Sequence, residues 1–439
     1  MKKAIALLLC IFSMLSLFGC GEKAAPTATE PGPEPTVKKD YSAFAGIVAD
    51  PKTWYDEFMA LPIANDQMTE DELRQLCVEA FKANLSFVWT PNKAITYLYE
   101  LTGDNYTVNL EPGIAYSGLA YATGSSSGTL YKVLKYYDRE TGVVDVEAMD
   151  DAAIMSIMTS ACARGAQQAW NRVSNSNSLG IMPTWNQFDS NILLVGTYNY
   201  AQEDYNYNFN RGKATDKIIE KNGKDVMYES YAMMKPADGL YSSSAWHVMM
   251  CGAEPVVVRN STGKIDPSQS YVLILEQETI GTLSTKRNYQ QENGVTLRPL
   301  GTVNEKFTFK KLLEQAYIPF TLKEFVGEDP VEPGEAYLGD RMKKKVAPAS
   351  MKEAFSLMLC ANYVICTVDV VVRAPDGQVL VSYDPGYRTT PGTYSVSLQV
   401  ALDAERLAPY ANGKNTIHVY AQLANGEYKE AYSGLLQLD

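Results

Sequence analysis

The chain has 439 residues, of which 46% are hydrophobic and 21% are charged, a balance typical of a globular protein with buried cores. It carries 51 acidic and 39 basic residues for a net charge of −12, and apart from "RMKKK" near residue 341 it has no long basic stretch. This charge argues against a nucleic-acid partner, because such proteins gather Lys and Arg on one surface.

Residues 1–19 have the pattern of a secretory signal peptide. Two lysines precede an apolar run that is too short for a membrane-spanning helix. The run ends in Leu17-Phe18-Gly19-Cys20, which resembles the bacterial lipobox and so implies that Cys20 carries a lipid. A plain secretory signal is the alternative. With the lipobox, we expect an extracytoplasmic protein that is lipid-anchored to the bacterial cell membrane.

Residues 20–40 are rich in Pro, Glu, Thr and Ala, a composition that cannot bury a core and that predicts a disordered tether. The remaining length exceeds one ordinary core. We predict a first domain over residues 41–326, a linker over 327–349 and a second domain over 350–439.

The first domain begins with helical elements over residues 41–110. Thr69 and Glu72 have capping-box spacing at the start of an amphipathic helix that contains Cys77. We interpret Cys77 as a buried core residue and these helices as decoration in front of the core.

Cys162 lies in "IMTSACARGAQQAWNRVSNS", where apolar residues recur at helical spacing. Thr159 and Ser160 are candidate caps, so Cys162 is predicted in the first helical turn. The positive end of a helix dipole favours the thiolate at such a position. A buried cysteine without chemistry is the alternative.

His247 is one of only two histidines, and it begins an apolar, β-branched run after a turn at residues 235–238. Residues 271–277, "YVLILEQ", predict an antiparallel partner strand that could present a polar side chain to the imidazole. A thiol–imidazole pair requires such a third group. Glu276 and Gln277 point to opposite faces, so only one can serve; Glu276 is preferred and Gln277 stays open.

This order of a cysteine-headed helix, a turn, a histidine opening a strand and a polar residue on the next strand resembles the NlpC-type papain-like cysteine peptidases of bacterial cell walls. The related CHAP domains share the order. Upstream, Tyr121 and Gly124 resemble the Gly-x-Pro-Tyr-x-x-Gly segment of that family. The sequence departs from the family at Ala161 and Ala163, which flank Cys162. It also departs at Ala237, where the turn of the family has a glycine.

The resemblance implies an α+β fold with a papain-like core, in which a helix packs on an antiparallel sheet. It implies that Cys162 attacks an amide carbonyl, that His247 transfers the proton and that Tyr121 binds substrate. The expected substrates are peptidoglycan peptides or other extracytoplasmic peptides, without a cofactor. Two distant histidines without a carboxylate cluster make a zinc site improbable.

The last ninety residues have short alternating strands separated by turns, which predicts an Ig-like β-sandwich. His418 belongs to one of these strands and is interpreted as a half-exposed residue without chemistry. Cys360 and Cys366 could pair, although spacing does not decide it. Two functional alternatives remain open, an inactive papain-like binding or scaffolding lipoprotein and an unrelated solute-binding lipoprotein.

Overall fold

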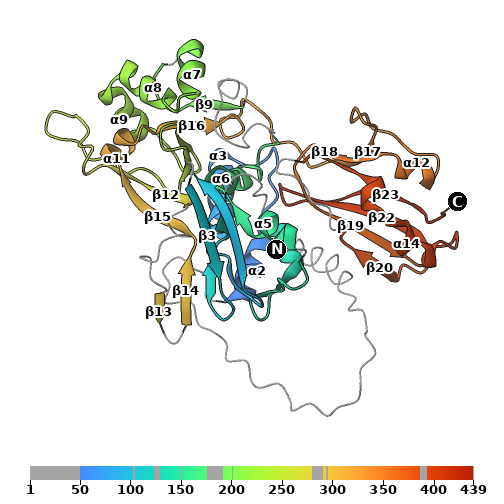
Figure 1. Ribbon diagram of the computed structural model, residues 1–439. Coiled ribbons are helices and arrows are strands. Elements are labelled where there is room, and N and C mark those ends of the chain that lie inside the picture. Colours follow the sequence, from blue (N-terminus) through green and yellow to red (C-terminus); the bar gives the residue numbers. More distant parts are fainter. Residues whose placement is uncertain are drawn as a thin grey trace, which may run out of the picture.

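The computed structural model describes residues 50–101, 104–122, 129–149, 151–175, 191–199, 201–278, 290–292, 295–385 and 393–438. The predicted signal peptide, Cys20, the tether and Gly124 lie outside these residues. The described part mixes helices with several sheets, as the predicted α+β class requires (Figure 1). None of its helices combines the length and the apolarity needed to cross a membrane.

A six-stranded antiparallel sheet carries the first part of the molecule. Its strands, in spatial order, are β15 (Gly301–Thr308), β12 (Tyr271–Gln277), β11 (His247–Cys251), β10 (Gly239–Ser242), β16 (Ile318–Leu322) and β9 (Ile192–Leu194). The strands predicted at residues 247 and 271–277 are confirmed. The inner strands are almost fully buried, as expected of a sheet covered on its faces.

Two helices, α3 (Glu70–Ser86) and α6 (Cys162–Trp170), pack together against this sheet. The predicted capping box is confirmed, since the Thr69 hydroxyl accepts from the Glu72 amide at 3.3 Å and Glu72 Oε2 accepts from the Thr69 amide at 2.8 Å. Gly165 allows the close approach of α6, because a Cβ there would stand 3.0 Å from the Phe81 ring and 3.1 Å from Cβ of Gln277. The Cys77 helix is therefore part of the core rather than decoration.

Short strands form a second, mixed sheet, a hairpin and a parallel pair. The second sheet has the order β13 (Gln290–Glu292), β14 (Val295–Pro299), β4 (Ala115–Ser117), β1 (Val88–Pro91), β7 (Val143–Val144) and β6 (Tyr137–Asp138); the hairpin is β2 (Ile95–Leu101) with β3 (Asp104–Leu110), and the pair is β5 (Ala120–Tyr121) with β8 (Thr159–Ser160). The helices expected within residues 41–110 are confirmed as α2 (Pro51–Met59) and α3, and strands β1, β2 and β3 follow them.

The remaining helices of this part are short. They are α4 (Leu130–Val133), α5 (Asp151–Met158), α7 (Gln202–Phe209), α8 (Ala214–Asn222), α9 (Lys224–Ala232) and α11 (Phe309–Glu314). Figure 1 shows α7, α8 and α9 gathered at one end of the molecule, away from the C-terminal strands. Helix α11 and strand β16 are the last helix and strand described before residue 326.

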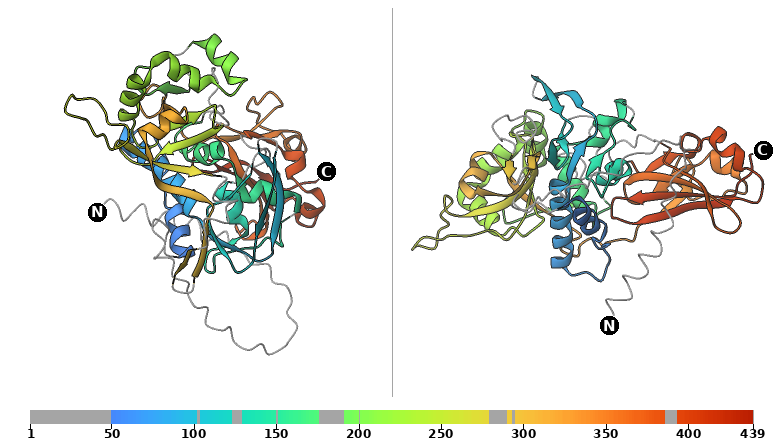
Figure 2. Two further views of the ribbon diagram at one scale, coloured as in Figure 1. Left: turned by 60° about the vertical axis from the view of Figure 1, so that its left-hand side comes forward. Right: turned by 90° about the horizontal axis from the view of Figure 1, so that it is seen from below.

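Two antiparallel sheets make the C-terminal part and enclose one apolar core (Figure 2). One sheet has the order β17 (Ala336–Gly339), β18 (Met358–Ala361), β21 (Ser395–Ser397), the other β20 (Val379–Tyr383), β19 (Ile365–Arg373), β22 (Thr416–Leu423), β23 (Tyr428–Leu435), and the helices are α12 (Met351–Phe355), α13 (Leu398–Ala401) and α14 (Ala404–Leu407). The linker predicted over 327–349 is partly wrong, because β17 lies within it and pairs with β18.

Candidate active site

Helix α6 begins at Cys162, after a break in the chain direction. Helix α5 ends at Met158, and Thr159 and Ser160 then pair as β8 with Ala120 and Tyr121 of β5. The prediction that Thr159 or Ser160 caps the helix is wrong, because strand pairing holds both residues before the cap position and the Thr159 hydroxyl donates to the Met155 carbonyl. The N-cap is Ala161, whose side chain makes no capping hydrogen bond. The positive end of the helix dipole therefore acts on Cys162 without a capping side chain to offset it.

The imidazole of His247 meets the carboxylate of Glu276, with 2.6 Å between Nε2 and Oε2. In the antiparallel register of β11 and β12, Met250 pairs with Leu275. When this register is continued toward the start of β11, His247 lies diagonal to Glu276 on the same face of the sheet. The side chains are 18% and 10% exposed, so the contact is largely sheltered from water.

Gln277 is excluded as the partner of His247, because it points to the opposite face of β12. Its Nε2 donates to the carbonyls of Leu119 at 2.7 Å and Leu300 at 3.1 Å. Of the two residues that the sequence left open, the structure thus brings Glu276 to the imidazole, while Gln277 ties β12 to the neighbouring loops.

The Cys162 thiol and the His247 imidazole lie close enough for each group to shift the pKa of the other. Burial alone would raise the pKa of Cys162, but the His247 charge, its hydrogen bond and the Val248 and Ala163 backbone amides bring the pKa below its usual value. Burial alone would lower the pKa of His247, whereas Cys162 and Glu276 raise it to about 10. Both shifts favour a thiolate beside an imidazolium over a neutral thiol–imidazole pair.

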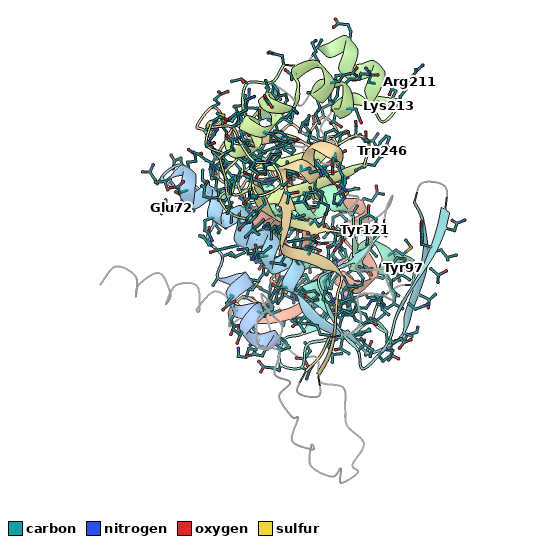
Figure 3. All side chains as sticks on the ribbon, turned by 90° about the vertical axis from the view of Figure 1, so that its left-hand side faces the viewer. Glu72, Tyr97, Tyr121, Arg211, Lys213 and Trp246 are labelled. Atoms are coloured by element: carbon teal, nitrogen blue, oxygen red, sulfur yellow. The ribbon has the colours of Figure 1, made fainter. Side chains whose placement is uncertain are left out.

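Tyr121 and Trp246 both lie next to the Cys162 sulfur. The Tyr121 hydroxyl lies 4.0 Å from the Cys162 sulfur, and the Trp246 carbonyl oxygen lies 3.9 Å from it. Figure 3 shows both residues on the same side of the molecule. Trp246 has φ of 50° and is 47% exposed, while Cys162 is 3% exposed. The aromatic residue before His247 thus forms the exposed border of the site.

The turn before β10 holds a residue other than glycine in the left-handed region. Ala237 has φ of 69°, and its amide donates to the Cys251 carbonyl at 2.8 Å. The Arg74 guanidinium lies 2.6 Å from the carboxylate of Asp238 and ties α3 to this turn. Both charged groups are buried, so the pair fixes the turn rather than acting on a substrate.

Sequence reasoning missed Tyr317 and Trp246. The Tyr317 ring lies edge-on to the His247 imidazole, with the ring centroids 6.5 Å apart. Its position depends on the pairing of β16 with β10, which no local sequence pattern predicts. Trp246 could have been found from its position next to His247.

The other described cysteines behave differently from Cys162. They are all unbridged and buried, and burial raises the pKa of Cys77, Cys251, Cys360 and Cys366. Cys360 and Cys366 therefore do not form the disulfide that the sequence left open. Within the described ranges, no three His, Cys, Asp or Glu side chains gather as a metal site requires.

Comparisons with known proteins give no relative for this chain: no family model, curated protein or solved structure matches it. A thiolate, an imidazolium able to donate a proton and a carboxylate that orients the imidazole are the groups required for nucleophilic acyl transfer.

Proposed function

We propose that the protein is a cysteine hydrolase that cleaves amide bonds in cell-wall peptides. The observation that carries the proposal is the continuous contact from the Cys162 thiol through the His247 imidazole to the Glu276 carboxylate. Groups with such displaced pKa values cluster at catalytic sites more often than elsewhere.

The reaction follows from the positions of these groups. The Cys162 thiolate adds to the amide carbonyl, the C–N bond breaks as His247 gives its proton to the leaving amine, and a thioester remains. A water molecule then attacks the thioester, His247 takes its proton, and the released carboxylic acid leaves the thiolate free. Glu276 holds the ring and favours its protonated form.

The architecture supports an NlpC-type, papain-like assignment for the first part of the chain. A helix that starts with the nucleophile packs on an antiparallel sheet, and the histidine and the carboxylate occur on adjacent strands in the expected order. The Ala161 and Ala163 departures leave the helix start unobstructed, and Ala237 keeps the positive φ for which the family uses glycine. The paired C-terminal sheets are compatible with an Ig-like domain.

Residues beside Trp246 suit an acidic peptide. Gly212, with φ of 65°, lies against the Trp246 indole, since a Cβ there would stand 3.2 Å from its Nε1. Its neighbours Arg211 and Lys213 are exposed, and Figure 3 shows them beyond Trp246 on the same side as Tyr121. Wall peptides carry free carboxylates, which these cations would attract, while Trp246 and Tyr121 contact the chain near the scissile bond.

The location is part of the proposal. A lipid on Cys20 and the tether over 20–40 would hold the enzyme at the outer face of the membrane, within reach of the wall.

The test compares full-length protein with Cys162→Ala and Cys77→Ala on purified peptidoglycan, with released peptides measured by mass spectrometry. We expect release by the unmodified protein, no detectable release by Cys162→Ala, and little change for Cys77→Ala in the fraction that folds. Release by Cys162→Ala at the original rate would refute the proposal, and a folded protein that releases nothing would favour the inactive scaffold.

A further inference from the structure

A small cavity lies away from the thiol, between the first part of the chain and the C-terminal sheets. One wall is α6 and the turn after it, with Arg164, Gln167, Asn171 and Arg172; Lys132 of α4 and Cys366 of β19 stand on other sides. The space open to the centre of a water molecule is about 60 Å³. One water needs about 10–15 Å³ by such a measure, so several waters or one small group can enter.

Three buried amide groups of this cavity have an atom without a hydrogen-bond partner among the described residues. They are Oδ1 of Asn84, Nε2 of Gln167 and Oδ1 of Asn171. The three residues are only 4%, 3% and 4% exposed. Buried polar atoms are almost always satisfied, so two acceptors and one donor on residues around one cavity indicate an occupant that supplies the missing partners.

The cavity is also cationic. Lys132, Arg164 and Arg172 line it, and none of its described lining residues is acidic. The Asp384 carboxylate interacts electrostatically with Lys132. This single negative charge does not balance the three cations of the lining. Burial lowers the pKa of Lys132 to about 8 and also lowers the pKa of Arg164, which shows that both cations are held in a poorly hydrated place.

Aromatic rings fix the position of one cation. The Arg172 guanidinium lies over the rings of Phe58 and Tyr131, at 5.1 and 5.5 Å from their centroids. Gly426 comes so close that a Cβ there would stand 2.5 Å from Nη1 of Arg172. The guanidinium is thus held in place before any ligand arrives, as a carboxylate site requires.

We propose that this cavity binds the C-terminal end of a peptide whose last residue is small. The carboxylate would bind Arg164, Arg172 and the Gln167 amide, and the amide N–H of the last residue would donate to Asn84 or Asn171. The apolar parts of Leu130, Val364 and Ile365 would contact the small side chain.

Other occupants fit less well. Fully ionised phosphate or sulfate offers only acceptors and leaves the two asparagine oxygens unsatisfied. A metal ion would meet three cations, and the ammonium of a free amino acid would be repelled by the same charges. A carboxylate accepts from the cations and from the Gln167 amide, and the neutral N–H beside it satisfies one of the two asparagine oxygens.

The experiment is titration calorimetry of the full chain carrying Cys162→Ala, with N-acetylalanine of either hand as probe and N-acetylalaninamide as the uncharged control. We expect saturable binding of at least one acid enantiomer and at least tenfold weaker binding of its amide. Because Cys162→Ala removes the nucleophile, this outcome does not depend on the proposed hydrolysis.

Variants locate the binding. Gln167→Met and Arg164→Met should each weaken the acid at least tenfold, whereas Arg259→Met, at an exposed ion pair with Glu229, should not change it. Melting curves show whether each variant is folded. If Gln167→Met does not fold, Arg164→Met, at a partly exposed site, provides the test. Equal binding of acid and amide, no binding up to the solubility limit, or full binding by the folded cavity variants would overturn the proposal and leave a water-filled cavity.

Discussion

The two histidines of the chain occupy similar surroundings in different parts of the molecule. His247 on β11 meets Glu276 at 2.6 Å, and His418 on β22 meets Glu430 at 2.5 Å. Each imidazole side chain is 18% exposed. The difference lies in what else each ring meets: His247 interacts with the Cys162 thiol in the first region, whereas Nε2 of His418 contacts the Thr416 hydroxyl at 3.0 Å in the second.

This comparison shows that an imidazole–carboxylate pair is not a catalytic site by itself. The carboxylate orients the imidazole and favours its protonated form, but nucleophilic catalysis also requires a nucleophile in contact with the imidazole. Thr416 cannot take this part, because its hydroxyl has no helix dipole or second amide donor to favour ionisation, whereas Cys162 begins a helix and receives backbone amides.

The largest difference between the two regions should appear when each imidazole is removed in turn. We expect His247→Ala to lower kcat/KM for peptide hydrolysis by on the order of 10³-fold, since the proton donor is lost. His418→Ala should leave hydrolysis within about twofold, because it would disturb only the contacts of β22. Rates are measured on one synthetic wall peptide, and equal losses in the two variants would contradict the assignment.

A smaller effect is expected from neutralising the carboxylates. Glu276→Gln should reduce kcat/KM by on the order of 10²-fold. The carboxylate helps raise the pKa of His247, so its removal should lower that pKa and move the alkaline fall of hydrolysis from near pH 10 to lower pH. Glu430→Gln is the matched control. A pH–rate profile that is identical for Glu276→Gln and the unmodified protein would show that Glu276 does not act on the ring.

The smallest effect concerns two turns, the one before β10 and the one before β22. Ala237 and Gly413 have nearly the same φ, 69° and 70°. Gly413→Ala should destabilise the fold by about 1 kcal/mol, because a left-handed conformation disfavours a Cβ. Ala237→Gly should change the unfolding free energy by less than about 1 kcal/mol, since relief of strain is offset by loss of a buried methyl group and by chain entropy.

Urea unfolding measures both turn variants. A loss above about 2 kcal/mol in Ala237→Gly would mean that the packing of the methyl group, rather than the turn geometry, selects alanine at this position.

Local patterns predicted the elements that carry the site. The capping box at Thr69 and the strands at His247 and residues 271–277 could be read from the sequence, because caps and alternation act over a few neighbouring residues. The break before Cys162 was expected, but its cap was not, because the pairing of β8 with β5 depends on residues nearly forty positions upstream.

Contacts between distant segments could not be predicted. The choice between Glu276 and Gln277 depends on the register of β12 against β11, and a shift of one residue would exchange their faces. Tyr317 and the Arg74–Asp238 pair likewise join segments that are far apart in the chain. Strand β17 was assigned to a linker because its four residues are too few to show a pattern.

The most direct test of the Cys162–His247 pair is the pH dependence of alkylation by iodoacetamide, followed residue by residue with mass spectrometry. The thiolate should persist as the pH falls below the usual thiol range, so Cys162 should react at pH 7 nearly as fast as at pH 9, and its rate should fall only at lower pH. His247→Ala should restore an ordinary profile. A Cys162 rate that rises through pH 9 in the unmodified protein, as for an unpaired thiol, would contradict the account.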